Sequence, residues 1–192
     1  MLITKSIIKA AIPCAAKNDI RNYLNGALFE WTNSDKRLRV ISTNGLVLSA
    51  LSVEVPYCED VDFSIIVPLE VLIYVSKIKN PAEELKPNGD GWQFADRLFK
   101  PLDGKFPDYR RVIPDFKGRV SSPANFDPYL LVLARKALTA YYDKEAVFIF
   151  HLQQYGYDGA AMHNGQNDAM VVIMPARLTE HDVPALQYRG FV

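Results

Sequence analysis

Apolar side chains recur at helical spacing in three stretches of the chain, and short β-type runs follow each stretch. The spacing predicts helices over residues 4–16, 69–79 and 127–139. We expect Pro13 to shorten or kink the first helix, because proline lacks the N–H that a helix interior uses. The recurrence predicts a structural unit, one helix followed by strands, that occurs three times along the chain.

Strands are expected where β-branched and aromatic residues run between turn signals. In the first unit, a polar turn and the pair Asn44 and Gly45 separate three such runs, which predicts an antiparallel meander. The predicted strands cover residues 27–31, 38–42, 47–55, 63–67, 91–95, 97–101, 146–153, 157–163 and 169–174. The fold class is therefore α+β.

The composition is that of an ordinary soluble protein and excludes several classes of function. Of 192 residues, 49% are hydrophobic, and 22 Lys and Arg balance 22 Asp and Glu, so bulk positive charge cannot hold nucleic acid. Cys14 and Cys58 are too few for a disulfide framework and suit a reducing cytoplasm. No apolar run approaches the ~18 residues of a membrane span, and Lys5 and Lys9 interrupt the apolar start that a signal peptide needs. We expect a cytoplasmic protein with no membrane partner.

Sorting the charges by segment changes the meaning of the neutral total. Residues 1–21 hold four basic side chains against one acidic, and residues 69–80 and 127–139 each hold two against one. All three predicted helices are therefore basic. A fold that aligned them would have one positive face, although ordinary solvated helix surfaces give the same count.

Patterns that carry catalysis or metal binding are sparse. His151, His163 and His181 lack the spacing and neighbours of a metal site, and no phosphate-binding loop or Gly-x-Ser-x-Gly motif is present. A segment rich in glycine, proline and charge could hold an acid/base site, but mixed charge in a connector is more typical of structural ion pairs. Its charged residues include Asp103, Asp108, Arg110, Arg111 and Asp115. We expect no enzyme, no catalytic residue, no metal and no cofactor.

Four stretches of the chain carry a more specific signal. Residues 103–114 read Asp-Gly-Lys-Phe-Pro-Asp-Tyr-Arg-Arg-Val-Ile-Pro, and the other three stretches cover residues 18–26, 40–49 and 171–178. In order and spacing, the four resemble the bacterial DNA polymerase III beta subunit, the sliding clamp. The resemblance implies a DNA clamp fold, with helices on one face and sheets on the other. It also implies three parts, which are 1–116 resembling the middle clamp domain, 117–178 resembling half of the C-terminal domain, and a C-terminal extension 179–192.

In this family the helices line a central hole, so the resemblance turns the basic helices toward the phosphates of double-stranded DNA. Residues 17–23 match a loop that contacts DNA in the family, with a solvated turn as the alternative. The residues expected to contact DNA are Lys5, Lys9, Lys17, Asn18, Arg21, Asn22, Tyr23, Lys77, Arg135 and Lys136.

Clamps of this family also have a hydrophobic pocket for a short peptide, approximately Gln-Leu-x-Leu-Phe, from DNA polymerase and other replication or repair proteins. The matching positions here are Leu24, Thr43, Gly45, Leu46, Val47, Leu48, Pro107, Arg111, Val112, Val172, Ile173, Met174, Pro175 and Arg177. Apolar residues rimmed by arginine suit such a peptide, although residues that only pack a junction would look the same. Leu46 and Val47 stand where clamps usually have His-Arg, which makes the pocket more apolar. Gln187 and Phe191 have the spacing of the peptide, so we hypothesise that the extension occupies a pocket.

The resemblance implies a DNA polymerase processivity factor that encircles or contacts duplex DNA and docks partner peptides. The alternative is a non-catalytic modulator that competes with the host sliding clamp or joins it. The unpaired half-domain also predicts self-association, in which two such halves meet across a two-fold axis. We expect a dimer or a tetramer.

Overall fold

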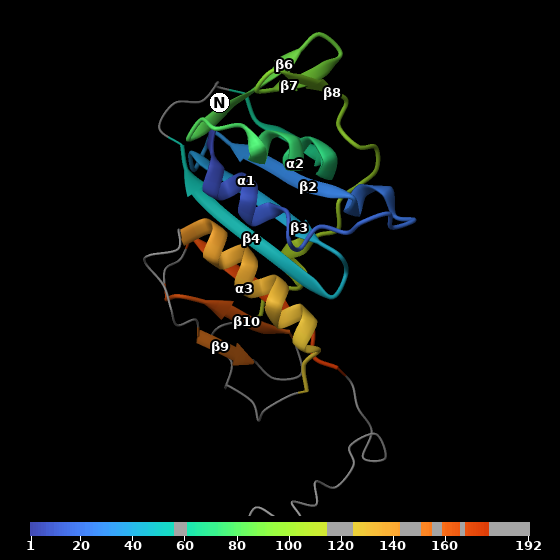
Figure 1. Ribbon diagram of the computed structural model, residues 1–192, viewed down its shortest axis with the longest axis vertical. Helices are drawn as coiled ribbons and strands as arrows, with labels where there is room; N and C mark the ends of the chain where they lie inside the picture. The colour runs from blue at the N-terminus through green and yellow to red at the C-terminus, as the bar shows by residue number, and fades with distance from the viewer. Residues whose placement is uncertain (56–60, 115–124, 143–150, 155–158, 166–167, 177–192) are drawn as a thin grey trace, which may run out of the picture.

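The computed structural model places three helices on one face of a seven-stranded antiparallel sheet (Figure 1). It describes residues 1–55, 61–114, 125–142, 151–154, 159–165 and 168–176. The helices are α1 (Lys5–Ala11), α2 (Leu69–Lys77) and α3 (Pro128–Tyr142). They lie side by side, with α1 between α2 and α3. The α+β class and the helices on one face confirm the fold expected from the sequence.

The large sheet has the strand order β5-β2-β3-β4-β11-β10-β9. Its strands are β2 (Gly26–Thr32), β3 (Arg37–Thr43), β4 (Val47–Glu54), β5 (Phe63–Pro68), β9 (His151–Gln154), β10 (Ala160–His163) and β11 (Ala169–Ile173). A small sheet with the order β1-β6-β7-β8 lies at one end of the molecule (Figure 1). Its strands are β1 (Leu2–Thr4), β6 (Ala82–Asn88), β7 (Gly91–Phe94) and β8 (Arg97–Phe99).

The first two units share the element order β-α-β-β-β and exchange their first strands. Strand β1 of the first unit pairs with β6 of the second, where Leu2 faces Glu84. Strand β5 of the second unit pairs with β2 of the first, where Val67 faces Ala27. The third unit, α3 with β9 to β11, attaches through β11 to the free edge of β4. The predicted threefold recurrence is confirmed, and the exchange links the first two units into one body.

The first helix is shorter than the prediction of residues 4–16 at both ends. Thr4 belongs to β1, which the prediction missed, and the helix begins at the next residue. It ends at Ala11, ahead of Pro13, as the missing N–H of proline leads one to expect.

Strand β6 was also missed, because charged side chains break its apolar alternation. Its Glu83 is buried, which the polar character of the segment did not suggest. The Asn80 Nδ2 donates to Glu83 Oε1 at 3.0 Å, and the Lys5 Nζ lies 4.0 Å from the same oxygen. A paired carboxylate therefore takes an inward position on this strand.

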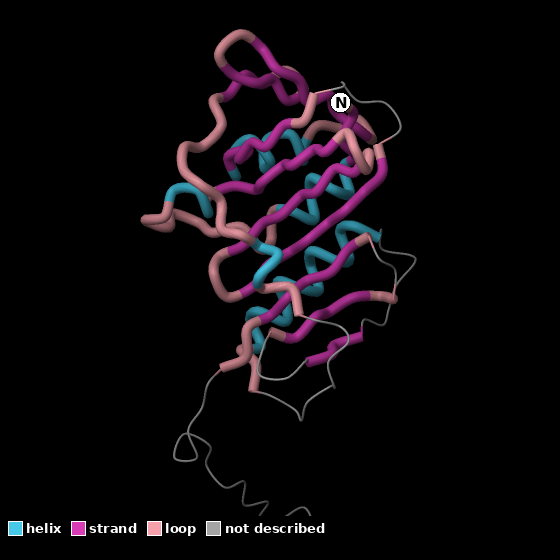
Figure 2. The backbone as a smooth tube through the Cα atoms, turned by 180° about the vertical axis from the view of Figure 1, so that it is seen from behind, coloured by secondary structure: helices cyan, strands magenta, loops and turns pink. Residues whose placement is uncertain are grey.

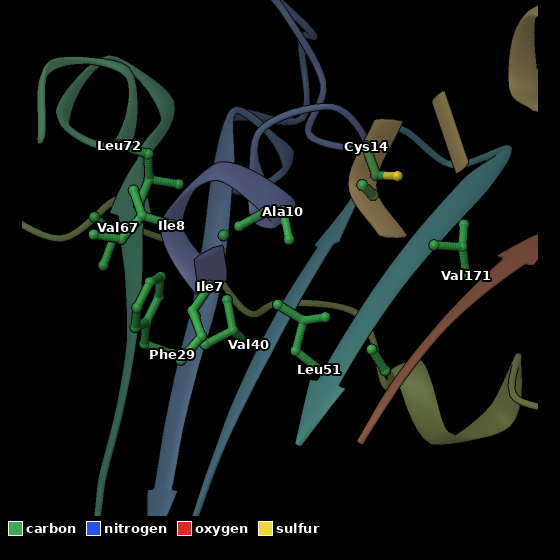
Figure 3. Close-up of a cluster of buried hydrophobic side chains, with 14 of the residues drawn as sticks. Ile7, Ile8, Ala10, Cys14, Phe29, Val40, Leu51, Val67, Leu72 and Val171 are labelled. Carbon is green, nitrogen blue, oxygen red and sulfur yellow. The ribbon is translucent and has the colours of Figure 1, made fainter. Parts of the chain in front are cut away.

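Alternation along the strands of the large sheet gives it two apolar faces. Phe29, Val40 and Leu51 point toward the helices and share a core with Ile7 and Ile8 of α1 (Figure 3). The register places Phe29 opposite Val40, and Val40 opposite Leu51, so one continuous row of buried side chains crosses three strands. This row holds α1 against the centre of the sheet.

The other face of the sheet is crossed by residues 100–114, here called the connector, which links the second and third units (Figure 2). It contains the short 3-10 helix η2 (Tyr109–Arg111). The side chains that meet there come from five strands and the connector, and include Leu28, Ile41, Leu48, Ile66, Phe106, Tyr109 and Val172. The connector thus covers a second, smaller core.

Tyr109 fixes the connector to the sheet. Its ring is buried, and its hydroxyl donates to Glu30 Oε1 at 3.2 Å. Arg110 stacks on the ring, with its Cζ 4.4 Å from the centroid, and pairs with the same carboxylate at 2.5 Å. Burial and the Glu30 charge raise the pKa of Tyr109 to about 12, so the hydroxyl stays protonated as a donor.

A cluster around Asp168 joins the third unit to the rest of the chain. The hydroxyls of Tyr141 and Tyr142, at the end of α3, donate to its two carboxylate oxygens at 3.0 and 2.6 Å. Its backbone carbonyl accepts the N–H of Ser52 in β4 at 2.8 Å. One residue therefore connects α3, β11 and β4.

The two cysteines differ in how far the structure describes them. Cys14 is buried, which raises the pKa of its thiol to about 12 and keeps it protonated. Cys58, Arg177 and the extension 179–192 lie outside the described residues. Within the described part of the chain, no helix has both the length and the apolar character needed to cross a membrane.

Candidate functional site

The turn between β3 and β4 is held by its own side chains. Thr43 Oγ1 donates to the Val47 carbonyl at 2.8 Å and accepts the Gly45 N–H at 3.0 Å. Asn44 Oδ1 accepts the N–H groups of Leu46 and Val47 at 2.9 and 3.0 Å. Gly45 has φ of +95°, a left-handed conformation that favours glycine. These hydrogen bonds fix the conformation of the turn. The pair Asn44 and Gly45 predicted a turn at this position.

Beside this turn, on the connector side of the sheet, lies a cavity of about 220 Å³ that we call the docking pocket. The turn is joined to the end of β11, since the Leu46 carbonyl accepts the Met174 N–H at 2.9 Å. The lining residues are Arg21, Leu24, Thr43, Gly45, Leu46, Val47, Leu48, Phe106, Pro107, Tyr109, Val112, Val172 and Met174. Four segments that are distant in sequence thus meet at one hollow.

Most residues predicted for a pocket line this cavity, but three described ones do not. Arg111 is 86% exposed, and its Nε pairs with Asp108 Oδ2 at 3.3 Å instead. Ile173 points to the core beneath the helices, because alternation along β11 sends Met170 and Val172, but not Ile173, to the connector side. Pro175 follows the lining residues without joining them.

Three lining residues were not predicted for the pocket. Phe106 and Tyr109 stand beside Pro107 in the connector stretch, and both are buried against the sheet. Arg21 was assigned to DNA contact instead. The aromatic character of Phe106 and Tyr109, within a stretch already singled out, was the available signal.

Arg21 forms the rim of the docking pocket. Its Nε and Nη2 donate to the two carboxylate oxygens of Asp19 at 3.0 and 2.8 Å. This double hydrogen bond lowers the pKa of Asp19 to about 2 and raises that of Arg21, so both stay charged. The guanidinium lies over the turn, where a Cβ added to Gly45 would come within 3.2 Å of Nη2.

The docking pocket has an apolar floor and a charged rim. Leu24, Leu48 and Val172 are buried on the connector side and form an apolar floor, whereas Leu46 is exposed at the mouth. Such a cavity binds apolar side chains, and the Arg21 guanidinium can hydrogen-bond a carbonyl or carboxylate of the same ligand.

The loop before η1 (Asn22–Leu24) is also well defined. Asn25 brackets it, because its amide donates to the Asp19 carbonyl and accepts the Asp19 N–H, both at 2.8 Å. The residues predicted for DNA contact are exposed at Lys17, Asn18, Arg21 and Asn22, and half-buried at Tyr23. The loop therefore presents polar side chains to solvent next to the docking pocket.

The helices carry exposed basic side chains. Lys9 on α1, Lys77 on α2, and Arg135 and Lys136 on α3 are all exposed. Among the described residues, none of these four forms an ion pair. Their charges are therefore available to an anionic surface.

Lys5 differs from the other lysines that the sequence assigned to DNA. Its side chain is only 13% exposed, and its Nζ donates to the Val75 carbonyl and approaches Glu83. Burial lowers the pKa of Lys5, while the Glu83 carboxylate acts in the opposite direction. We therefore assign Lys5 to the junction of α1, α2 and β6 and remove it from the set of candidate DNA contacts.

Three charged residues of the connector, Asp108, Arg110 and Arg111, are bonded to one another or to the sheet. Asp108 accepts the Arg110 N–H at 3.3 Å and pairs with Arg111, while Arg110 pairs with Glu30. In the ranges that the structure describes, no three His, Cys, Asp or Glu side chains gather in a way that could hold a metal ion. The connector thus has the ion-pair network that its mixed charge suggested.

The amino-acid sequence is similar to one family over the first two units. Residues 2–108 match the family described as DNA polymerase III beta subunit, central domain. The beta sliding clamp of Escherichia coli strain K12 is 34% identical over 117 residues, covering 57% of this chain and 31% of that protein. The beta sliding clamp of Pseudomonas putida strain KT2440 is 30% identical over 109 residues, covering 52% of this chain and 28% of that protein. The chain spans less than a third of the length of these relatives.

The fold is similar to solved structures over nearly the whole chain. The DNA polymerase sliding clamp of Bacillus subtilis matches with a TM-score of 0.75 and 15% identity, over 93% of this chain and 64% of that one. A Helicobacter pylori beta clamp bound to a DNA ligase peptide matches with a TM-score of 0.71 and 15% identity, over 91% and 63%. The structural match includes the third unit, which the sequence match to the central domain does not reach.

Proposed function

The chain belongs to the DNA polymerase III beta subunit family, and from this we propose that it is a sliding-clamp-like processivity factor without catalytic activity. In this proposal the protein contacts or encircles duplex DNA with its helix face and holds partner proteins in the docking pocket. One observation carries the proposal. Every residue that lines the pocket comes from the four family-like stretches, 18–26, 40–49, 103–114 and 171–178.

The proposed ligand of the docking pocket is a short peptide of the type Gln-Leu-x-Leu-Phe. Its leucine and phenylalanine side chains suit the floor of Leu24, Leu48 and Val172, and its backbone carbonyls suit the guanidinium of Arg21. The beta clamp bound to a DNA ligase peptide, to which the fold is similar, supports a peptide as the class of ligand. We propose DNA polymerase and other proteins with such a motif as partners.

The proposed DNA surface is the helix face together with the loop before η1. Lys9, Lys77, Arg135 and Lys136 project from three adjacent helices and have no ion-pair partner in the described part of the chain. DNA that lies inside a ring, or against an open surface, meets only the helix face, so only this face must be positive. The neutral total charge is therefore compatible with DNA binding.

Self-association is part of the proposal, because the third unit has apolar side chains that nothing in the described structure covers. Tyr129 and Val132 of α3 and Leu152 of β9 are exposed. We propose that two third units meet across a two-fold axis to form a dimer, with a tetramer as the ring-closing form. Light scattering at micromolar concentration tests this, and a monodisperse monomer would contradict it.

A second candidate function follows from the part of a clamp that the chain matches in sequence. That match covers 31% of the Escherichia coli clamp, and in this alternative the chain acts on a complete clamp, either by joining it or by competing for its peptides. Loading onto circular DNA with a polymerase present distinguishes the two functions. A processivity factor lengthens the synthesised products by itself, whereas a modulator changes them only when a complete clamp is added.

The peptide proposal is tested by calorimetry with Gln-Leu-Ser-Leu-Phe. We expect the wild-type protein to bind it, and Met174→Arg to weaken binding by tenfold or more, roughly 1.4 kcal/mol, since the charged side chain enters the apolar pocket. Met170→Arg is the matched control, because Met170 packs on the connector side of β11, four residues before Met174, but does not line the docking pocket. Absence of binding by the wild type, or equal binding by both variants, would contradict the proposal.

The DNA proposal is tested with the triple variant Lys9→Glu, Arg135→Glu and Lys136→Glu. We expect it to weaken duplex binding at low salt by about tenfold and to reduce the dependence on salt concentration, since each lost phosphate contact releases one counterion fewer. The control is Lys100→Glu, an exposed lysine that directly follows β8 and lies on none of the three helices. Equal binding by the triple variant and the wild type would contradict a DNA-facing helix surface.

A further inference from the structure

A second cavity, of about 740 Å³, lies beside the docking pocket and has no role in the proposed function. We call it the edge groove. The connector forms one wall, and strands β2 and β5 form the other, with Leu28, Glu30 and Ser64 among the lining residues. Its volume is within the range of ligand-binding clefts.

The edge groove adjoins the docking pocket. Phe106, Pro107 and Tyr109 line both cavities, so these three connector residues form the boundary between them. A chain that leaves the docking pocket across Phe106 and Pro107 enters the edge groove directly.

One wall of the edge groove is an open edge of the large sheet, because β5 is the outermost strand on that side. The Leu102 N–H donates to the Ile66 carbonyl at 2.9 Å, so the main chain of Ile66 faces away from β2. Backbone groups of an antiparallel strand alternate in direction, so Ser64, two residues earlier, also directs its N–H and C=O outward. Among the described residues, no backbone group bonds to Ser64 from that side.

The charges around the groove leave one cation free. Glu30 is paired with Arg110 at 2.5 Å, and Asp108 is paired with Arg111 at 3.3 Å. Lys105 lines the groove, is exposed and has no ion-pair partner in the described part of the chain. The uncompensated charge of the groove is therefore positive.

We propose that the edge groove binds the extended flank of the partner peptide, which adds as a strand to β5 and places an acidic side chain against Lys105. The open edge at Ser64 supplies the main-chain hydrogen bonds of strand addition, and Lys105 selects an acidic sequence. The inference rests on the proposed function, because the peptide motif in the docking pocket brings the flank to the groove.

The test compares three peptides by calorimetry: Gln-Leu-Ser-Leu-Phe alone, and the same motif with an acidic, β-branched flank of about six residues at its N- or C-terminus. We expect one flanked peptide to bind wild-type protein about tenfold more tightly than the motif, the gain of two or three added polar contacts. Ser64→Pro removes the outward N–H without affecting the pairing of β5 with β2, and should abolish that gain while leaving motif binding unchanged. Ser64→Ala, which keeps the N–H, should retain the gain.

Lys105→Glu should reduce the gain as well, whereas Lys100→Glu, outside the groove, should not. If the motif binds and neither flank adds affinity, or if Ser64→Pro and Ser64→Ala act alike, the edge groove is not the site and the docking pocket stands. If a flanked peptide binds in a manner that depends on Ser64 while the motif alone does not bind, the groove stands and the docking pocket fails. If no peptide binds, both are overturned.

Discussion

The first two units and the third unit have the same kind of architecture, yet they are anchored in different ways. Each of the first two contributes a strand to the sheet of the other, through the pairs β1 with β6 and β5 with β2. The third unit donates only β11 to an existing edge and lays α3 beside α1. It leaves Tyr129 of α3 60% exposed. The first two units each supply a strand to a sheet of the other, whereas, among the described strands, the third unit is joined to the large sheet only through the pairing of β11 with β4.

This difference affects both proposed roles. The helix face proposed for DNA includes α3, and the docking pocket is lined by Val172 and Met174 of the third unit, so both surfaces cross the junction between the two regions. The pocket therefore exists only while β11 remains on β4. Loss of order in the third unit should remove peptide binding even if the first two units stay folded.

The largest expected effect is in the strand-exchanged pair. Phe29 of the large sheet is fully buried and meets Phe94 of the small sheet edge to face, with ring centroids 6.2 Å apart. We expect Phe29→Ala to lower the free energy of unfolding by about 3–5 kcal/mol, measured by urea denaturation. Hydrogen exchange should show β2 and β7 losing protection together.

The control for this change is Leu98→Ala, because Leu98 lies on the outer strand β8 and is largely exposed. Its loss should be within about 0.5 kcal/mol. If β7 kept its protection in Phe29→Ala while β2 lost it, the two exchanged units would not form one cooperative body.

A smaller effect is expected at the attachment of the third unit. Tyr142→Phe removes the hydroxyl that donates to Asp168 at 2.6 Å and should cost about 1–2 kcal/mol, because the acceptor is a half-buried carboxylate. Hydrogen exchange should place the loss in α3 and β11 and spare β2 and β5. Tyr129→Phe, on the exposed side of the same helix, should have no effect, and a loss spread evenly over the chain would contradict a separate attachment.

The smallest expected effect is a pH dependence confined to the third unit. Burial and the facing His151 lower the pKa of His163 below its usual value of 6.5. The unfolded chain therefore takes up this proton first as the pH falls below 6.5, and the third unit loses stability between about pH 7 and pH 5. Exchange protection of β10 at the two pH values measures this, and His163→Gln should flatten it. A variant as pH-sensitive as the wild type would exclude His163 as the cause.

Local pattern predicted the elements of the fold well, but could not predict how the strands pair. The helix after Pro68 and the meander of β2 to β4 follow from periodicity and turn residues. The exchange of β1 and β5 depends on contacts between distant segments, which no local pattern encodes. Strand β6 was missed because a charged residue, Glu83, occupies one of its buried positions. The pairing of Lys5 with this buried carboxylate was therefore also unexpected.

The docking pocket was largely predictable because its lining comes from four stretches with a specific resemblance. What the sequence could not provide is the direction of side chains. Arg21 belongs to a loop that resembles a DNA-contacting loop of the family, and the resemblance assigned it to DNA. Its double hydrogen bond to Asp19, which the sequence did not predict, holds the guanidinium over Gly45 at the rim of the pocket.

The exchange of first strands has a consequence for the newly synthesised chain. Strand β1 leaves the ribosome long before its partner β6 exists, and the Met1 amine and the Leu85 carbonyl that it meets at 2.9 Å are 84 positions apart. Until β6 emerges, β1 has no strand to pair with and remains an open edge. The strand pairing of the first unit is therefore completed only after translation of the second, and a pause within β6 would prolong a state open to aggregation or to capture by a chaperone.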